Sequence, residues 1–121
     1  MSERTLVLVK PDGVQRQLVG RILDRYEERG LKIVGLKLMR ANRDLAERHY
    51  DAHRERPFFA GLVEFITSAP LVALALETAQ NIVHASDGPE AATTELGLWF
   101  SDGELFDYER DVDRWVLAPG D

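Results

Sequence analysis

The chain has 121 residues, 45% of them hydrophobic, and a formal net charge of −6 at pH 7. That length suits one domain with a real core and leaves no room for a second. The acidic balance argues against nucleic acid as the main partner, although the charge is uneven: residues 1–56 hold 13 Lys or Arg against 9 Asp or Glu, and residues 57–121 hold 2 against 12.

No cysteine is present, so disulfides are excluded, and the charged amino terminus does not resemble a signal peptide. The longest uncharged run, residues 65–76, is too short and too polar to span a bilayer. We therefore expect no membrane association, and the composition is compatible with a cytoplasmic protein.

The first half of the chain predicts two strands joined by a helix. A buried strand from Thr5 to Lys10 runs into a Pro-Asp-Gly turn, and a helix from Leu18 to Arg29 is ended by Gly30 in a left-handed conformation. A second strand extends from Leu31 to Met39. Lys10 either snorkels at the sheet edge or directs its charge at an anionic ligand, and the sequence leaves both interpretations open.

Two further helices and a strand follow. The first helix runs from Asp44 to Asp51, capped by Asn42 or Arg43, and the second from Pro57 to Thr67; a buried strand covers residues 71–76. Two neighbouring phenylalanines at the start of the second helix point about 100° apart, so only one ring can face the core. Taken alone, Phe58 and Tyr50 are more typical of core packing than of a site.

A short strand from Ile82 to Ala85 places His84 at its carboxyl end, where open α/β sheets carry their chemistry. The following Asp-Gly-Pro-Glu sequence begins a helix that we expect from Pro89 to Phe100. His84 would then lie beside a helix amino terminus, which favours anions. A single histidine is nevertheless more often structural than catalytic.

One carboxylate lies on the apolar stripe of this last helix. Ala91, Glu95, Leu98 and Trp99 are spaced at i, i+4, i+7 and i+8, so Glu95 is expected to face inward. A buried acid needs a partner, and an imidazole would suit it, because the contact fixes which ring nitrogen carries the proton. The alternative is a half-exposed glutamate whose stem snorkels.

Three segments of the chain together resemble the nucleoside diphosphate kinase family, in the family's order and over most of the chain: TLVLVKPDGVQRQLVGRI, HYDAHRERPFFAGLVEFITSAPLVA and NIVHASDGPEAATTELGLWF. The resemblance implies that His84 accepts the γ-phosphate of a nucleoside triphosphate and passes it to a diphosphate in a ping-pong cycle. The other residues that it implies are Lys10 at the phosphates and ribose, Tyr50, Ser86 and Glu95 around the histidine, Phe58 and Leu62 at the base, and Asn81 at the sugar.

The resemblance also implies a ferredoxin-like βαββαβ core, an α/β sandwich with helices on an antiparallel sheet, in a single domain 1–121 with an extended tail at about 101–121. Its partners would be ATP and other nucleoside tri- and diphosphates, and Mg²⁺ would be held mainly by the nucleotide phosphates. A homo-oligomer built from dimers is expected, with apolar tail residues against a neighbouring subunit.

The chain departs from the family between Leu76 and Asn81. Members carry there a helix, a loop, two phosphate-binding arginines and a threonine, whereas this chain has only Glu-Thr-Ala-Gln. In a ferredoxin-like sheet the last two strands run parallel on either side of the first, and such a crossover needs about a dozen residues or more. Because the motifs on both sides match the family, we expect that residues are missing from the sequence as given, and not that the fold is different. A true deletion would weaken phosphate binding.

Three functions remain open at this point. The first is an active nucleoside diphosphate kinase. The second is a catalytically impaired relative that binds nucleotides or partners, and only the short connection supports it. The third is a ferredoxin-like regulatory module with a structural His84, which the joint presence of the implied site residues disfavours.

Overall fold

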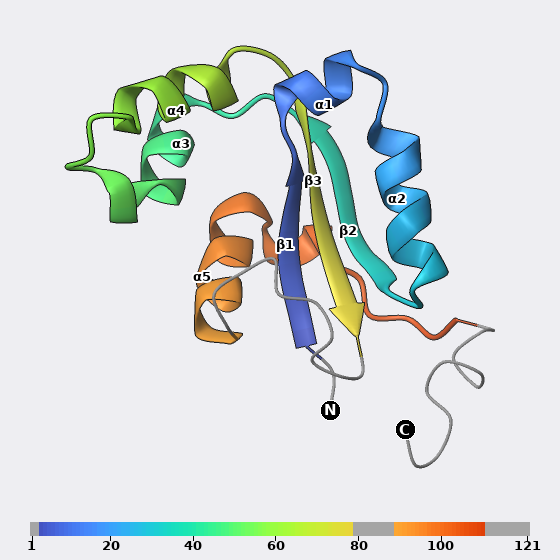
Figure 1. Ribbon diagram of the computed structural model, residues 1–121. Coiled ribbons are helices and arrows are strands. Elements are labelled where there is room, and N and C mark those ends of the chain that lie inside the picture. Colours follow the sequence, from blue (N-terminus) through green and yellow to red (C-terminus); the bar gives the residue numbers. More distant parts are fainter. Residues whose placement is uncertain (1–2, 79–88, 111–121) are drawn as a thin grey trace.

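The computed structural model describes residues 3–78 and 89–110, apart from the Pro89 side chain (Figure 1). The predicted strand from Ile82 to Ala85 lies outside the described residues, and so do three of the implied site residues, Asn81, His84 and Ser86.

The described part of the chain forms a three-stranded antiparallel sheet with the order β1-β3-β2. Its strands are β1 (Glu3–Val9), β2 (Lys32–Met39) and β3 (Leu71–Thr78). The central strand is a continuous apolar run that is buried from Leu71 to Leu76, because it is covered on both faces. The position of β3 between β1 and β2, and its antiparallel pairing with both, agree with the expected ferredoxin-like arrangement.

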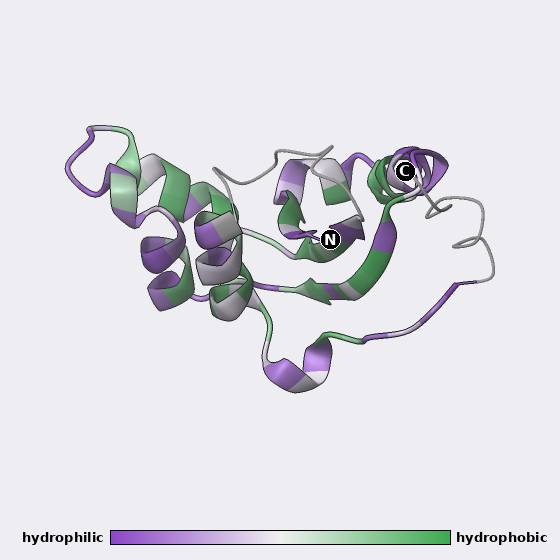
Figure 2. Cartoon of the chain, turned by 90° about the horizontal axis from the view of Figure 1, so that it is seen from below, coloured by the Kyte–Doolittle hydropathy of each residue, from purple (hydrophilic) through white to green (hydrophobic). Residues whose placement is uncertain are grey.

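One face of the sheet packs against α3 (Arg43–His49), α4 (Phe59–Thr67) and α5 (Pro89–Trp99) (Figures 1 and 2). Alternate residues of β1 and β3 point to this face, as the pleat of a strand requires. The larger hydrophobic core lies here; it includes Leu6, Val34, Ala46, Val63, Ile66, Leu71, Ala73, Ala75, Leu96 and Trp99.

The opposite face is covered by α1 (Pro11–Gln15) and α2 (Val19–Glu28), which follow β1 directly. Val9, Val72 and Leu74 form a smaller core there, against partly buried side chains of the two helices. The strand residues that face α1 and α2 are therefore the alternates of those that face α5. Both faces of the sheet exclude water, which is what makes β3 so uniformly apolar.

Several element boundaries differ from those that the sequence predicts. The Pro-Asp-Gly segment is not a simple turn but begins α1, because Pro11 suits the first position of a helix. The helix α4 begins at Phe59 and not at Pro57. A 3₁₀ turn, Asp51–His53, and the hydrogen-bonded turns that follow it include Pro57. The strand β3 continues to Thr78, where it pairs with Glu3.

Two predicted helix ends are confirmed. Asn42 caps α3, because its side-chain oxygen accepts a hydrogen bond from the Leu45 amide at 2.8 Å, and the helix ends at His49 rather than Asp51. After α2, Gly30 adopts a φ of 82° and its amide donates to the Glu27 carbonyl at 3.0 Å. None of the described helices is both long and apolar enough to cross a membrane.

The chain after α5 lies against β2. An irregularity between Ile33 and Gly35 interrupts the pairing of β2 with β3, and the Val34 carbonyl accepts a hydrogen bond from the Phe106 amide at 2.9 Å. A 3₁₀ turn, Asp102–Glu104, precedes this contact. Lys37 also binds Glu104 at 2.8 Å. The tail therefore packs on its own sheet as far as the structure describes it.

Candidate active site

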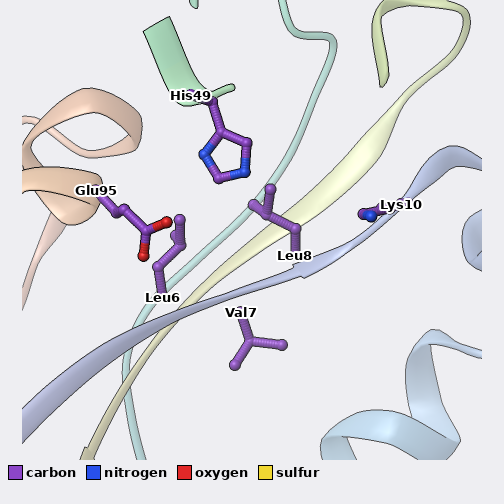
Figure 3. Close-up of a pocket in the computed structure, with 6 residues that line it drawn as sticks. All are labelled: Leu6, Val7, Leu8, Lys10, His49 and Glu95. Atoms are coloured by element: carbon purple, nitrogen blue, oxygen red, sulfur yellow. The ribbon is translucent and has the colours of Figure 1, made fainter. Parts of the chain in front are cut away.

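A cavity of about 260 Å³ lies at the outer edge of β1 (Figure 3). Three consecutive strand residues contribute to it, Leu6, Val7 and Leu8, and consecutive side chains of a strand point to opposite faces. A cavity in contact with both orientations must lie at a strand edge. The other edge of β1 pairs with β3, so this is the outer one, where the expected fourth strand would pair.

The cavity brings together three polar side chains from separate elements: Lys10, His49 and Glu95. Lys10 is exposed at the point where β1 ends and α1 begins. His49 ends α3, and Glu95 lies in the middle of α5. Figure 3 shows the imidazole and the carboxylate extending toward the space beside β1, with the lysine at the end of the strand.

Glu95 is half-buried at the margin of the apolar stripe of α5. The fully buried residues of this helix are Ala92, Leu96 and Trp99. The buried stripe therefore runs through Ala92 and Leu96, one residue away from the predicted Ala91 and Glu95. The helix is rotated slightly about its axis relative to the prediction. This rotation places the Glu95 carboxylate in the wall of the cavity and not inside the core.

His49 is a site residue that the sequence interpretation missed. Its Nδ1 accepts a hydrogen bond from the Trp99 Nε1–H at 3.1 Å, and the two rings meet edge to face with centroids 5.3 Å apart. An Nδ1 that accepts cannot carry a proton, so the neutral ring is protonated on Nε2. No local motif announces this role, because the partner lies fifty residues further along the chain.

The electrostatic surroundings of His49 favour its neutral form. Burial lowers the pKa of the imidazole below its ordinary value of 6.5; the Glu95 carboxylate opposes this effect and the Lys10 ammonium adds to it. The effect of burial is the largest of the three. His49 thus acts as a neutral hydrogen-bonding group between two charges.

Tyr50 follows His49 and is buried at the base of α3. Its ring meets the His49 ring at a centroid distance of 4.8 Å. Within the described residues its hydroxyl is buried without a hydrogen-bond partner. A buried hydroxyl in that position is costly unless a group from elsewhere satisfies it, which is consistent with a position next to a ligand or a further segment.

The two residues implied at the base, Phe58 and Leu62, lie one turn apart at the start of α4 and do not line the cavity at β1. Phe58 is 50% exposed, and its ring lies tilted against the His53 ring at a centroid distance of 5.5 Å. Leu62 is partly buried against the larger core. An exposed aromatic face anchored by a packed neighbour can accept a planar ligand.

The described residues hold no group of three or more His, Asp or Glu side chains that could bind a metal ion.

Comparison with known proteins identifies the family. The sequence model of the nucleoside diphosphate kinase family matches residues 3–80. A nucleoside diphosphate kinase of Thermomicrobium roseum is 45% identical over 148 aligned positions, which cover 96% of this chain and 99% of the relative. The chain belongs to the nucleoside diphosphate kinase family.

Solved structures agree with this assignment. The halophilic nucleoside diphosphate kinase of Halobacterium salinarum, in complex with CDP, superposes with a TM-score of 0.86 at 39% identity and covers 96% of this chain and 99% of that one. The Borrelia burgdorferi enzyme with bound vanadate and ADP, a transition-state mimic, gives 0.85 at 26% identity, with 96% and 97% covered. Nucleoside diphosphate kinases are phosphotransferases that act on nucleotides.

The alignment with the Thermomicrobium relative is longer than this chain. It contains 148 positions, 27 more than this chain has residues, so at least that many positions are occupied in the relative alone. The family match ends at residue 80, within the four residues that replace the expected crossover. This relative therefore has at least 27 residues that this chain lacks.

Proposed function

We propose that this nucleoside diphosphate kinase transfers the γ-phosphate of a nucleoside triphosphate through a phosphohistidine at His84. The observation that carries the proposal is the cavity at the outer edge of β1, which holds Lys10 and Glu95 where the strand ending in His84 is expected to pair. Ser86 and Tyr50 would help to hold the imidazole. Asn81, Phe58 and Leu62 would bind the sugar and the base.

The proposed cycle has two balanced steps. A nitrogen of the His84 imidazole attacks the γ-phosphorus, a nitrogen–phosphorus bond forms, and the bond to the β-phosphate oxygen breaks as the diphosphate leaves. A terminal oxygen of a second diphosphate then attacks the same phosphorus and releases the imidazole. Glu95 accepts a hydrogen bond from the N–H of the other ring nitrogen and so fixes the tautomer that attacks.

Charge neutralisation is the second requirement of phosphoryl transfer, because the protein does more positioning than covalent chemistry. Lys10 contributes one positive charge at the end of β1. Mg²⁺ bound to the nucleotide phosphates would neutralise charge that develops on their oxygens. The absent crossover would have supplied the family's two arginines and threonine, so nucleotide phosphates are held here by fewer groups.

Phosphoenzyme labelling tests the proposal. Incubation with magnesium ATP should give one acid-labile, base-stable phosphoryl group on His84, and GDP should remove it. His49→Ala and His53→Ala serve as matched controls, because they alter the other two histidines of the chain and should leave the labelled position unchanged. Equal labelling of His84→Ala and the parent would contradict the assignment.

A second candidate function is a nucleotide-binding relative with little turnover. The short connection at residues 77–80 favours it, because the phosphate-binding side chains that the resemblance places there are absent. Measurable nucleotide binding without a phosphoenzyme would establish this alternative, whereas a label that GDP removes would exclude it.

We further propose a single cytoplasmic domain that assembles through the β2 side of the sheet. Four large apolar side chains are exposed there, on β2 and on the tail that follows the 3₁₀ turn Asp102–Glu104: Leu36 at 49%, Leu38 at 66%, Phe106 at 62% and Tyr108 at 44%. Leu36, Phe106 and Tyr108 line one depression of the surface, and an exposed apolar patch of this kind marks subunit contacts. Sedimentation should give a dimer or a larger homo-oligomer, and Leu38→Asp should shift it toward monomer; a monomeric parent would contradict the proposal.

A further inference from the structure

The hydrogen bond between Trp99 and His49 spans two helices at the wall of the cavity. Trp99 is one of the largest fully enclosed side chains of the core, so its indole N–H needs an acceptor inside the protein. His49 Nδ1 supplies it at 3.1 Å. If the ring were protonated at Nδ1, two N–H groups would face each other and the buried donor of Trp99 would lose its acceptor.

The charged groups around His49 pull in opposite directions. Glu95, from α5, favours the protonated ring, and Lys10, at the end of β1, disfavours it; the neighbouring Tyr50 contributes an aromatic edge and no charge. A protonated His49 would attract the Glu95 carboxylate, because opposite charges in a partly buried cavity interact strongly. That attraction would draw Glu95 toward α3.

We propose that His49 is a positioning residue: the hydrogen bond from Trp99 keeps it neutral, and its neutrality leaves the Glu95 carboxylate available to the imidazole that receives the phosphoryl group. This inference rests on the proposed function. It assigns to Trp99 an electrostatic role besides packing, since the same indole that fills the core prevents a positive charge from forming next to Glu95.

Nuclear magnetic resonance of the full chain, labelled with ¹⁵N in histidine, tests the neutral state without any need for turnover. His49 should show the Nε2–H tautomer and a pKa below 6.5. Trp99→Phe keeps an aromatic ring in the core but removes the donor, so the His49 pKa should rise. An Nδ1–H tautomer in the parent, or an unchanged titration in Trp99→Phe, would overturn the inference.

The role in phosphoryl transfer is read from pH profiles of phosphoenzyme formation with magnesium ATP. Trp99→Phe should lose activity at a higher pH than the parent, because His49 then protonates more readily and captures Glu95. The double variant Trp99→Phe with His49→Gln should lose this acid limb, since an amide offers an acceptor and a donor but cannot be protonated.

A merely structural role gives a different result. Trp99→Phe would then lower the rate by the same factor at every pH, and His49→Gln would not change the shape of the profile; that outcome overturns the proposal.

Different results would contradict the proposed function and the positioning role of His49. If the parent forms no phosphohistidine, the proposed function fails, and the role of His49 in transfer fails with it. The histidine titration would still decide whether Trp99 holds the ring neutral. If labelling occurs on His84 but the Trp99→Phe profile keeps the parent's shape, only the positioning role of His49 is overturned.

Discussion

The outer edge of β2 is covered by the C-terminal segment of the same chain, whereas the outer edge of β1 faces a polar cavity in the part of the chain that the structure describes. At β2, the Phe106 amide and the Tyr108 hydroxyl donate to strand carbonyls, and Arg110 reaches the Gly30 carbonyl. At β1, charged and aromatic side chains surround the space where a strand is expected.

The two sheet edges differ because the chain segments that lead to them differ in length. The tail needs no crossover, because it leaves α5 and passes directly along β2. A strand at the outer edge of β1 and parallel to β3 must cross β1 and return along its length, which takes about a dozen residues or more. Only residues 77–80 stand between the expected strands. One edge is thus completed by the tail of the same chain, whereas the strand expected at the other edge needs a longer connection than residues 77–80 provide.

Lengthening the connection should produce the largest change. Inserting the crossover of the Thermomicrobium relative after Gln80 should raise turnover more than about a hundredfold, because each lost donor to developing charge costs roughly 10²–10³ in kcat. Steady-state transfer from ATP to GDP measures it. A Gly/Ser insert of equal length is the matched control, since it restores reach without cationic side chains.

The control decides between two causes. A large gain with the relative's segment alone means that phosphate-binding side chains are limiting. Equal gains with both inserts would mean that strand pairing at β1 is limiting. If neither insert changes turnover, the short connection has no functional consequence and the contrast between the two edges is wrong.

At the polar edge, Glu95→Gln should slow phosphoryl transfer by roughly ten- to a thousand-fold while the fold is retained, because a neutral amide oxygen is a weaker acceptor than a carboxylate for the imidazole N–H. Single-turnover labelling of His84 measures the rate, and circular dichroism checks the fold. Glu90→Gln, an exposed substitution in the first turn of the same helix, is the control and should be nearly silent. Equal rates for Glu95→Gln and the parent would make Glu95 structural.

At the covered edge, Gly35→Ala should lower the free energy of unfolding by about 1–3 kcal/mol through overpacking. A Cβ at this position would come within 2.8 Å of Leu105 and 3.0 Å of Phe100, which hold the tail on the sheet. Urea denaturation measures the loss. Gly61→Ala in α4 has no neighbour within 4 Å and should instead stabilise the protein by about 0.5–1 kcal/mol. Equal effects would show that the tail does not pack on Gly35.

Base binding is expected to be separate from both edges. Phe58→Ala should weaken every nucleotide by about 1–3 kcal/mol, because stacking on an aromatic face is tolerant of base identity. Isothermal titration with purine and pyrimidine diphosphates measures it. Phe65→Ala, a half-exposed ring further along α4, is the matched control and should leave affinity unchanged. A strong base preference that disappears in Phe58→Ala would contradict a tolerant platform.

The smallest effect concerns the pH dependence of the tail. Lys37 and the Ser101 amide hold the pKa of Glu104 down to about 2, from an ordinary value of 4.5. Because the folded-state pKa is depressed, the stabilisation is present above pH 4.5 and is lost as the pH falls toward 2. Glu104→Gln should remove this part of the acid destabilisation, whereas Glu109→Gln should not. Identical acid unfolding curves for all three proteins would contradict the pairing.

The sequence predicted those features that depend on neighbouring residues. The apolar runs gave the three described strands, Gly30 gave the end of α2, and Asn42 gave a cap. Lys10 and Glu95 were also singled out, and the structure places both at one cavity. Local patterns suffice for these because strand burial, caps and helix faces have short periods.

Features that depend on distant contacts could not be read in this way. The hydrogen bond from Trp99 to His49 joins residues fifty positions apart, and neither has a spacing that indicates the other. The start of α1 was missed because Pro-Asp-Gly also suits a turn. The contact of Phe106 with Val34 depends on an irregularity in β2 that the sequence does not mark.

Intact-mass spectrometry before and after incubation with magnesium ATP tests the central claim most directly. We predict that the protein becomes heavier by one phosphoryl group, returns to its first mass when GDP is added, and stays unchanged in His84→Ala. A starting mass several kilodaltons above the 13.7 kDa of the given sequence would confirm that residues are missing from that sequence. A mass of 13.7 kDa that ATP does not alter would contradict phosphoryl transfer by this chain.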